Sequence, residues 1–128
     1  MSKKKVLIVD DEENFVKLLK RNLDETGKYE VSALLNANDI INNVHVFKPD
    51  IILLDIIMPG TTGIEACQIL NNDLIGKGIP IIILSALVKD ADKQKAYKVG
   101  VVDYMEKPIE LKRLIEKIDR CILFKQSQ

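Results

Sequence analysis

Three aspartates stand directly after apolar runs, where the strands of α/β proteins end and their polar chemistry collects. Asp10 and Asp11 follow the run Lys5–Val9, and Asp55 follows Ile51–Leu54. In a parallel sheet the carboxyl ends of neighbouring strands meet at one edge, beside the point where the strand order reverses. We therefore expect the three acids to gather in one crevice, with Asp55 as the reacting group.

Such a trio of carboxylates is electrostatically unfavourable. Two carboxylates about 5 Å apart repel each other by roughly 3 kcal/mol at an effective dielectric constant of about 20. Without a partner, one of the acids would have to take up a proton. Mg²⁺ relieves the repulsion, because it prefers one or two carboxylates together with waters and phosphate oxygens. The three acids thus predict a magnesium site.

Two further polar side chains stand at the ends of later apolar runs. Ser85 directly follows Ile81–Leu84, and Lys107 comes soon after the weaker run Val101–Met105. Lysine supplies a positive point charge for a phosphate oxygen. Carboxylates, a divalent cation, a hydroxyl and a lysine together indicate a phosphoryl site. Asp55 needs no general base there, because a carboxyl with a pKa near 4 is already ionised at neutral pH and can form an acyl phosphate.

Apolar runs alternate with amphipathic segments along the whole chain. The unbroken runs Ile51–Leu54 and Ile81–Leu84 are typical of strands covered on both faces. This alternation predicts an α/β domain with a doubly wound, five-stranded parallel sheet and helices on both faces. Two strand orders are plausible, and a five-stranded chain of this size favours the flavodoxin-like order 2-1-3-4-5. Asn36 or Asn38 is the expected cap of the second helix. We expect strands at 5–9, 29–35, 51–54, 81–84 and 101–105, and helices at about 13–26, 63–72, 89–99 and 109–124, with the second helix lying between that cap and Pro49.

Size and composition favour a single domain with no obvious polyanionic partner. The chain has 128 residues, which predicts one domain over 1–124 and a tail or the start of a linker at 125–128. Lys+Arg and Asp+Glu both total 19, so no net charge points to nucleic acid or an anionic membrane. No apolar run approaches the roughly 20 residues that span a bilayer. Cys67 and Cys121 form no CxxC pattern, and we expect a reducing, cytoplasmic setting.

Four segments at the expected strand ends carry a resemblance to a known family. They are Val9-Asp10-Asp11-Glu12, Leu54-Asp55-Ile56-Ile57-Met58-Pro59-Gly60, Leu84-Ser85-Ala86 and Asp103-Tyr104-Met105-Glu106-Lys107-Pro108. In this order the chain resembles a receiver domain of the bacterial two-component response regulators, of the chemotaxis-regulator-like kind. The resemblance covers essentially the whole length and implies the same 2-1-3-4-5 strand order.

The resemblance implies a set of roles at the site. Asp55 would accept a phosphoryl group from the phosphohistidine of a histidine kinase or phosphotransfer protein. Asp10, Asp11, Asp55 and the backbone carbonyl of Ile57 would hold Mg²⁺. Lys107 would contact the phosphoryl group, and its peptide bond to Pro108 would be cis.

The resemblance also implies a switch and an output surface. Ser85 would move its hydroxyl onto the phosphate while Tyr104 turns inward, altering a surface of the fourth helix, fifth strand and fifth helix. A downstream partner or output domain would bind there, and this domain itself would bind neither nucleic acid nor membrane. We expect no enzymatic activity beyond transfer to its own aspartate and slow self-dephosphorylation. The self-dephosphorylation would be slow because Ile57 and Leu87, which would flank the phosphate, are apolar and could not position an attacking water. A phosphorylation-linked dimer, and a place in a longer regulator, are left open.

Three rival functions fit the residues less well. A haloacid-dehalogenase-type enzyme would need DxD after the first strand, and Asp10-Asp11-Glu12 lacks that spacing. A nucleotide-binding module would show GxxxxGK[ST] or GxGxxG after the first strand, and neither occurs there. The strongest rival is a receiver-like binding module that no longer accepts phosphate. The presence of all three acids and Lys107 argues against it.

Overall fold

All strands of the fold lie in one parallel sheet. The structure is a computed structural model, which describes residues 2–86 and 89–126. The strands are β1 (Lys4–Val9), β2 (Tyr29–Leu34), β3 (Ile51–Leu54), β4 (Ile81–Ser85) and β5 (Asp103–Glu106). Their order is β2-β1-β3-β4-β5, and every neighbouring pair is parallel. The predicted fold class and strand order are therefore confirmed.

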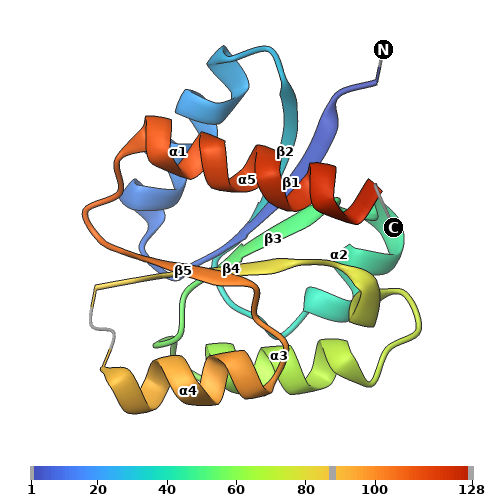
Figure 1. Ribbon diagram of the computed structural model, residues 1–128, viewed down its shortest axis with the longest axis vertical. Helices are drawn as coiled ribbons and strands as arrows, with labels where there is room; N and C mark the ends of the chain where they lie inside the picture. Colours follow the sequence, from blue (N-terminus) through green and yellow to red (C-terminus); the bar gives the residue numbers. More distant parts are fainter. Residues whose placement is uncertain (1, 87–88, 127–128) are drawn as a thin grey trace.

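Helices cover both faces of this sheet, as Figure 1 shows. They are α1 (Glu13–Glu25), α2 (Ile40–Phe47), α3 (Gly63–Asn71), α4 (Asp90–Lys98) and α5 (Leu111–Gln126), with a short 3-10 turn η1 (Gly76–Gly78). The helices α1 and α5 lie on one side, and α2, α3 and α4 lie on the other. Within the described ranges, no helix combines the length and apolar character needed to cross a membrane.

The core consists of two apolar layers separated by the sheet. Successive residues of the central strands alternate between the layers, because strand side chains point to opposite faces. Leu7, Val9, Ile52 and Leu54 pack under α2, α3 and α4, whereas Val6, Ile8, Ile51 and Leu53 pack under α1 and α5. All residues of β3 and β4 are buried. Two-sided burial explains why these strands are unbroken apolar runs.

Several element boundaries differ from those expected. The predicted caps of α2 were wrong: Asp39 precedes the helix, and Asn36 Oδ1 instead accepts a hydrogen bond from the Asn38 amide at 2.9 Å. The Asn36 side chain thus closes a turn before the helix and does not cap it. Strand β5 begins at Asp103 rather than at 101, and α5 runs from Leu111 to Gln126 rather than from 109 to 124. The Lys107–Pro108 peptide bond is cis, as the resemblance implies.

Candidate functional site

Two neighbouring strands bring the three aspartates together. Asp10 and Asp11 follow β1, Asp55 follows β3, and the Asp55 amide donates to the Val9 carbonyl at 3.0 Å. One carboxylate oxygen from each aspartate lies within 4.8 Å of the others. Asp10 and Asp55 are only 2% and 6% exposed, whereas Asp11 faces solvent. The expected meeting of these acids at one sheet edge is therefore present in the fold.

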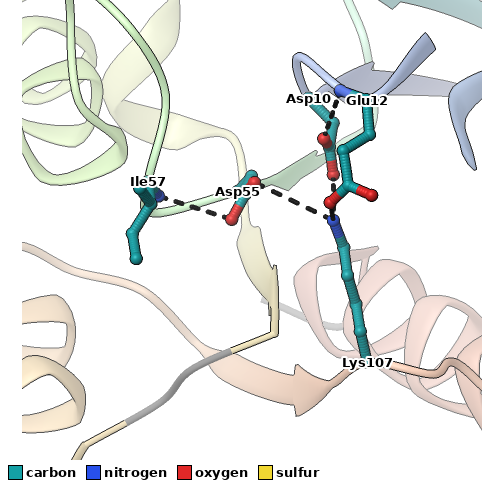
Figure 2. A network of polar contacts seen from close by, with 5 residues as sticks. All are labelled: Asp10, Glu12, Asp55, Ile57 and Lys107. Atoms are coloured by element: carbon teal, nitrogen blue, oxygen red, sulfur yellow. Dashed lines mark hydrogen bonds and ion pairs between the residues drawn. The ribbon is translucent and has the colours of Figure 1, made fainter.

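Lys107 reaches into the same crevice from the end of β5. Its Nζ lies 2.8 Å from Asp10 Oδ2, 2.7 Å from Glu12 Oε1 and 3.8 Å from Asp55 Oδ2. Figure 2 shows the ammonium beside Asp10 and Glu12, with Asp55 at the longer distance. The ammonium also lies 4.3 Å from the ring centroid of Phe15, within cation–π range. The Lys107 ammonium thus lies closer to Asp10 and Glu12, which follow β1, than to Asp55.

The polar contacts of the Asp55 carboxylate are longer than those of Asp10. The Ile57 amide donates to Asp55 Oδ1 at 3.4 Å, at the long limit of a hydrogen bond, from the side opposite Lys107 (Figure 2). Burial first, and then the negative charge of Asp10, raise the pKa of Asp55. Lys107 and the Ile57 amide oppose that rise, and Asp11 adds to it. Asp55 is therefore a carboxylate whose charge is incompletely balanced by the protein alone.

Lys107 stays charged despite its partial burial. Desolvation lowers its pKa, but hydrogen bonds to Asp10 and Glu12 and the charges of Asp10 and Asp55 outweigh desolvation and raise the pKa overall. A single ammonium nonetheless faces four carboxyl groups, because Asp11 stands beside the three acids that it approaches. The site keeps an excess of negative charge.

The donor set fits Mg²⁺. Three aspartate oxygens are close enough to share one small cation, and they are hard oxygen ligands of the kind that Mg²⁺ takes while retaining waters. A cation there would also offset the repulsion that raises the pKa of Asp55. Asp10, Asp11 and Asp55 are the residues that would hold it. The predicted part of the Ile57 carbonyl in this set stays a prediction, since the contact seen at Ile57 comes from its amide.

A close approach of backbone fixes the loop after Asp55. A Cβ added at Gly63 would lie 2.3 Å from the Asp55 carbonyl oxygen and 2.6 Å from Ile56 Cα, so only glycine fits there. The Gly63 amide donates to the Ile56 carbonyl at 2.8 Å. Thr62 and Glu65 form a capping box at the start of α3, each with a 3.2 Å hydrogen bond. These contacts hold the loop against the end of β3.

The two predicted switch residues lie on neighbouring strands. Ser85 is buried at the end of β4, where its carbonyl accepts from the Lys107 amide at 2.8 Å. Tyr104 of β5 is partly buried, and its hydroxyl accepts from Lys93 Nζ of α4 at 2.5 Å. The Tyr97 and Tyr104 rings pack edge to face with centroids 6.3 Å apart. Tyr104 therefore points toward α4 in this structure.

Sequence reasoning missed three contributors to this network. Glu12 contacts Lys107, Phe15 lies against its ammonium, and Lys93 binds the Tyr104 hydroxyl. The run of acids after β1 was a signal for Glu12, but nothing in the local sequence pairs Lys93 with Tyr104. Leu87, named above as a residue flanking the phosphate, lies outside the described residues. The functional roles assigned to Asp10, Asp11, Asp55, Ser85, Tyr104 and Lys107 stay predictions.

Comparisons with known proteins agree with this fold. The chain matches the family model of the response regulator receiver domain over residues 6–119. Its fold is similar to that of the Vibrio cholerae chemotaxis protein CheY4, with a TM-score of 0.88 and 26% identity over 94% of this chain and 99% of that one. It is also similar to a two-component response regulator from Clostridium difficile, with a TM-score of 0.88 and 27% identity over 98% of this chain and 100% of that one.

A third solved structure has a similar extent of overlap. The receiver domain of the Francisella response regulator 1452 has a TM-score of 0.84 and 28% identity, over 98% of this chain and 99% of that one. The family match runs from within β1 to the middle of α5 and so includes every residue of the crevice. The chain belongs to the response regulator receiver domain family.

Proposed function

We propose that Asp55 is the phosphoacceptor of a two-component signalling pathway and that its donor is the phosphohistidine of a histidine kinase or phosphotransfer protein. One observation carries this proposal. Asp10, Asp11 and Asp55 each place an oxygen within 4.8 Å of the others, and Lys107 Nζ lies 3.8 Å from Asp55. Apart from transfer to its own aspartate and slow loss of that phosphate, we propose no enzymatic activity.

The reaction is an in-line displacement at phosphorus. An Asp55 carboxylate oxygen forms the new bond to phosphorus as the bond to the donor's imidazole nitrogen breaks, and the electron pair of that bond stays with the imidazole. Neutralisation of the carboxylates and of the phosphoryl oxygens is the chemistry that bound Mg²⁺ supplies. Asp10 and Asp11, which directly follow β1, would hold this cation together with Asp55.

Lys107 provides the second positive charge. In the structure its ammonium is engaged by Asp10 and Glu12. A phosphoryl group on Asp55 adds roughly two negative charges and three acceptor oxygens close to that ammonium. The flexible lysine stem then allows Nζ to move from the β1 acids toward a phosphoryl oxygen. This shift changes the ion pairs that tie β5 to β1.

The proposed output is a change in the surface made by α4, β5 and α5. Ser85 and Tyr104 stand between the site and this surface, since Ser85 ends β4 and Tyr104 contacts α4. Phosphate would draw the Ser85 hydroxyl inward and release Tyr104 from its place beside Lys93. Such a switch biases a two-state element rather than creating a new one. A downstream protein or output domain would bind the altered surface.

Intact-mass measurement tests the phosphoacceptor proposal. The protein is incubated with acetyl phosphate and Mg²⁺, and the mass of one phosphoryl group is expected to appear. Asp55→Asn should abolish this adduct, whereas Asp50→Asn, which changes an aspartate at the other end of β3, should keep it. A wild-type protein that remains unmodified would favour the receiver-like binding module.

A further inference from the structure

A pocket of about 540 Å³ opens at the end of the sheet opposite Asp55. Its floor comes from the residues that precede β4 and β5, including Pro80 and Val102. Its wall comes from the last turns of α5, which Figure 1 places on the same side of the molecule as the loop leading into β4. Because the strands are parallel, their amino ends lie a full strand length from the acidic crevice. The pocket is therefore separate from the candidate phosphoryl site.

Three cationic side chains line this pocket: Lys77, Arg120 and Lys125. In the part of the chain that the structure describes, neither Lys77 nor Arg120 forms an ion pair with a carboxylate. The Lys125 ammonium donates to the Gly78 carbonyl, which ties the last turn of α5 to the loop before β4. The three charges are thus brought to one opening.

The negative groups of the pocket do not cancel these charges. Asp103 is the acid in the lining, and Lys117 Nζ already engages it at 2.5 Å. The carboxyl end of α5 carries a partial charge of only about half an electron. Three ammonium or guanidinium groups outweigh that partial charge. The pocket is electropositive, although the chain as a whole has a formal net charge of 0.

The rest of the lining is apolar and partly exposed. Phe124 is 65% exposed and Val102 is 50% exposed, and both line the pocket beside Ile79 and Pro80. A flat apolar group of a ligand would remove these surfaces from water, with a gain of roughly 25 cal/mol for each Å² buried. The volume falls within the roughly 300–1,000 Å³ of small-molecule sites. The lining thus combines a cationic rim with an apolar floor.

We propose that this pocket binds a small organic anion that carries a flat apolar ring, the chemistry shared by nucleoside phosphates and aromatic sulfonates or carboxylates. The anionic end would lie among Lys77, Arg120 and Lys125, and the ring would lie against Phe124 and Val102. This inference goes beyond the proposed phosphoacceptor function and does not depend on it.

Fluorescence titration with 8-anilinonaphthalene-1-sulfonate tests the site, since that probe has an anionic group on an aromatic body. Saturable binding is expected, and it should weaken as salt is raised. An exposed charge contributes up to about fivefold in affinity, so the double variant Lys77→Gln, Arg120→Gln should bind roughly tenfold more weakly. Arg113→Gln, on the same helix but outside the pocket, is the matched control and should bind like wild type. Equal affinity in the double variant and the control would overturn the proposal.

Cysteine protection gives the location of binding. Cys121 lines the pocket and Cys67 is fully buried, so the bound probe should slow alkylation of Cys121 by iodoacetamide at least threefold and leave Cys67 unchanged. Unprotected Cys121 at saturating probe would overturn the site.

Competition by adenosine 5′-monophosphate would assign the pocket to nucleoside phosphates, and competition by 1-naphthoate alone would assign it to aromatic carboxylates. Failure of both competitors together with displacement by uncharged naphthalene would show an apolar surface only and contradict the proposal.

Discussion

The ammonium of Lys107 lies 2.8 Å from Asp10 Oδ2, and this ion pair joins the carboxyl ends of β5 and β1 across the site. Both side chains are nearly enclosed, at 10% and 2% exposure. A buried ion pair gains little over a well-packed apolar pair, but loss of one partner leaves an uncompensated buried charge. Loss of Lys107 would therefore leave the buried Asp10 carboxylate without its closest counter-charge.

Replacing Lys107 should destabilise the metal-free protein. Lys107→Met keeps an unbranched stem against Phe15 but removes the charge that balances Asp10 and Glu12. We expect the free energy of unfolding to fall by roughly 3 kcal/mol in EDTA at pH 7.5. Urea unfolding followed by circular dichroism measures this change. Lys112→Met, an exposed lysine on α5, should change it by less than about 0.5 kcal/mol, and an equal effect in both variants would show that the ion pair is unimportant.

Asp55→Asn should have the opposite effect, with a defined pH dependence. The pKa of Asp55 is raised in the folded state, chiefly by burial and by Asp10. The folded state therefore binds its proton more tightly than the unfolded state, whose pKa is about 3.9. Ionisation of Asp55 then costs stability: the cost is absent below the unfolded pKa, grows as pH rises, and is complete above the folded pKa. Asparagine removes that cost.

The measurement for this second prediction is a series of urea titrations in metal-free buffer between pH 4 and pH 8. Asp55→Asn should become progressively more stable than wild type as pH rises, and the difference should level off near neutrality. Asp39→Asn provides the control, because Asp39 is exposed and its side chain makes no capping bond with α2. A difference that shrinks with rising pH would mean that the folded pKa of Asp55 is lowered instead.

The parts of the site set by strand ends could be predicted from sequence. β3 and β4 are buried on both faces, so each apolar run stops where the strand leaves the core. The next polar residue is then placed at the sheet edge, as at Asp55, while Ser85 forms the buried end of β4. The order of the strands brings Asp10 beside Asp55. Those positions follow from the apolar runs together with the strand order, which the family resemblance also implies.

Contacts between helices and strands could not be predicted in this way. Lys93 binds the Tyr104 hydroxyl because of the way α4 packs against β5. The residues around either side chain give no sign of this contact. Glu12 stands in the run of acids after β1, but its 2.7 Å contact with Lys107 joins residues 95 positions apart and is not written in that run. The cap of α2 failed for a local reason, since Asn36 closes a turn instead of capping the helix. Such features depend on how the elements pack and on local turns.

Mg²⁺ should stabilise the protein through Asp11. Asp11 is exposed, so its loss costs little in the metal-free state, but it removes one of three clustered oxygens. A ligand that binds only the folded state adds about 2.7 kcal/mol at a concentration about 100 times its dissociation constant. We expect that gain in wild type, with a higher melting temperature, and little of it in Asp11→Asn. Glu13→Gln, an exposed acid two positions along, should respond like wild type; identical Mg²⁺ responses in Asp11→Asn and wild type would remove Asp11 from the site.

Ile57 should prolong the life of the phosphorylated state. Its side chain is 61% exposed beside Asp55, and an apolar side chain cannot orient an attacking water by hydrogen bonding (Figure 2). Ile57→Asn should therefore speed the loss of phosphate severalfold, because a positioned polar group contributes to water activation. Decay of the phosphorylated mass in excess Mg²⁺ gives the rate. Ile57→Val keeps the apolar character and should decay as wild type does, whereas equal acceleration in both variants would indicate only greater access of solvent.

Lys93 should oppose the proposed movement of Tyr104. Its ammonium donates to the Tyr104 hydroxyl at 2.5 Å and lies 4.1 Å from the ring centroid, so both contacts hold the ring toward α4. Cation–π contacts at exposed sites contribute about 0.5–1 kcal/mol, which corresponds to a shift of roughly two- to fivefold in a two-state equilibrium. Lys93→Met should therefore favour the state in which Tyr104 has turned inward.

The apparent affinity for fluoroberyllate, an aspartyl-phosphate mimic, measures that shift. If the mimic binds the inward state more tightly, Lys93→Met should bind it two- to fivefold more tightly than wild type, because less of its binding energy is used to displace Tyr104. NMR signals of Ser85 and Tyr104 should report the same midpoint. Lys95→Met, an exposed lysine of the same helix, should leave the affinity unchanged. Equal affinities in Lys93→Met and wild type would show that Tyr104 does not move when Asp55 is occupied, and the proposed output route through α4, β5 and α5 would then need a different link.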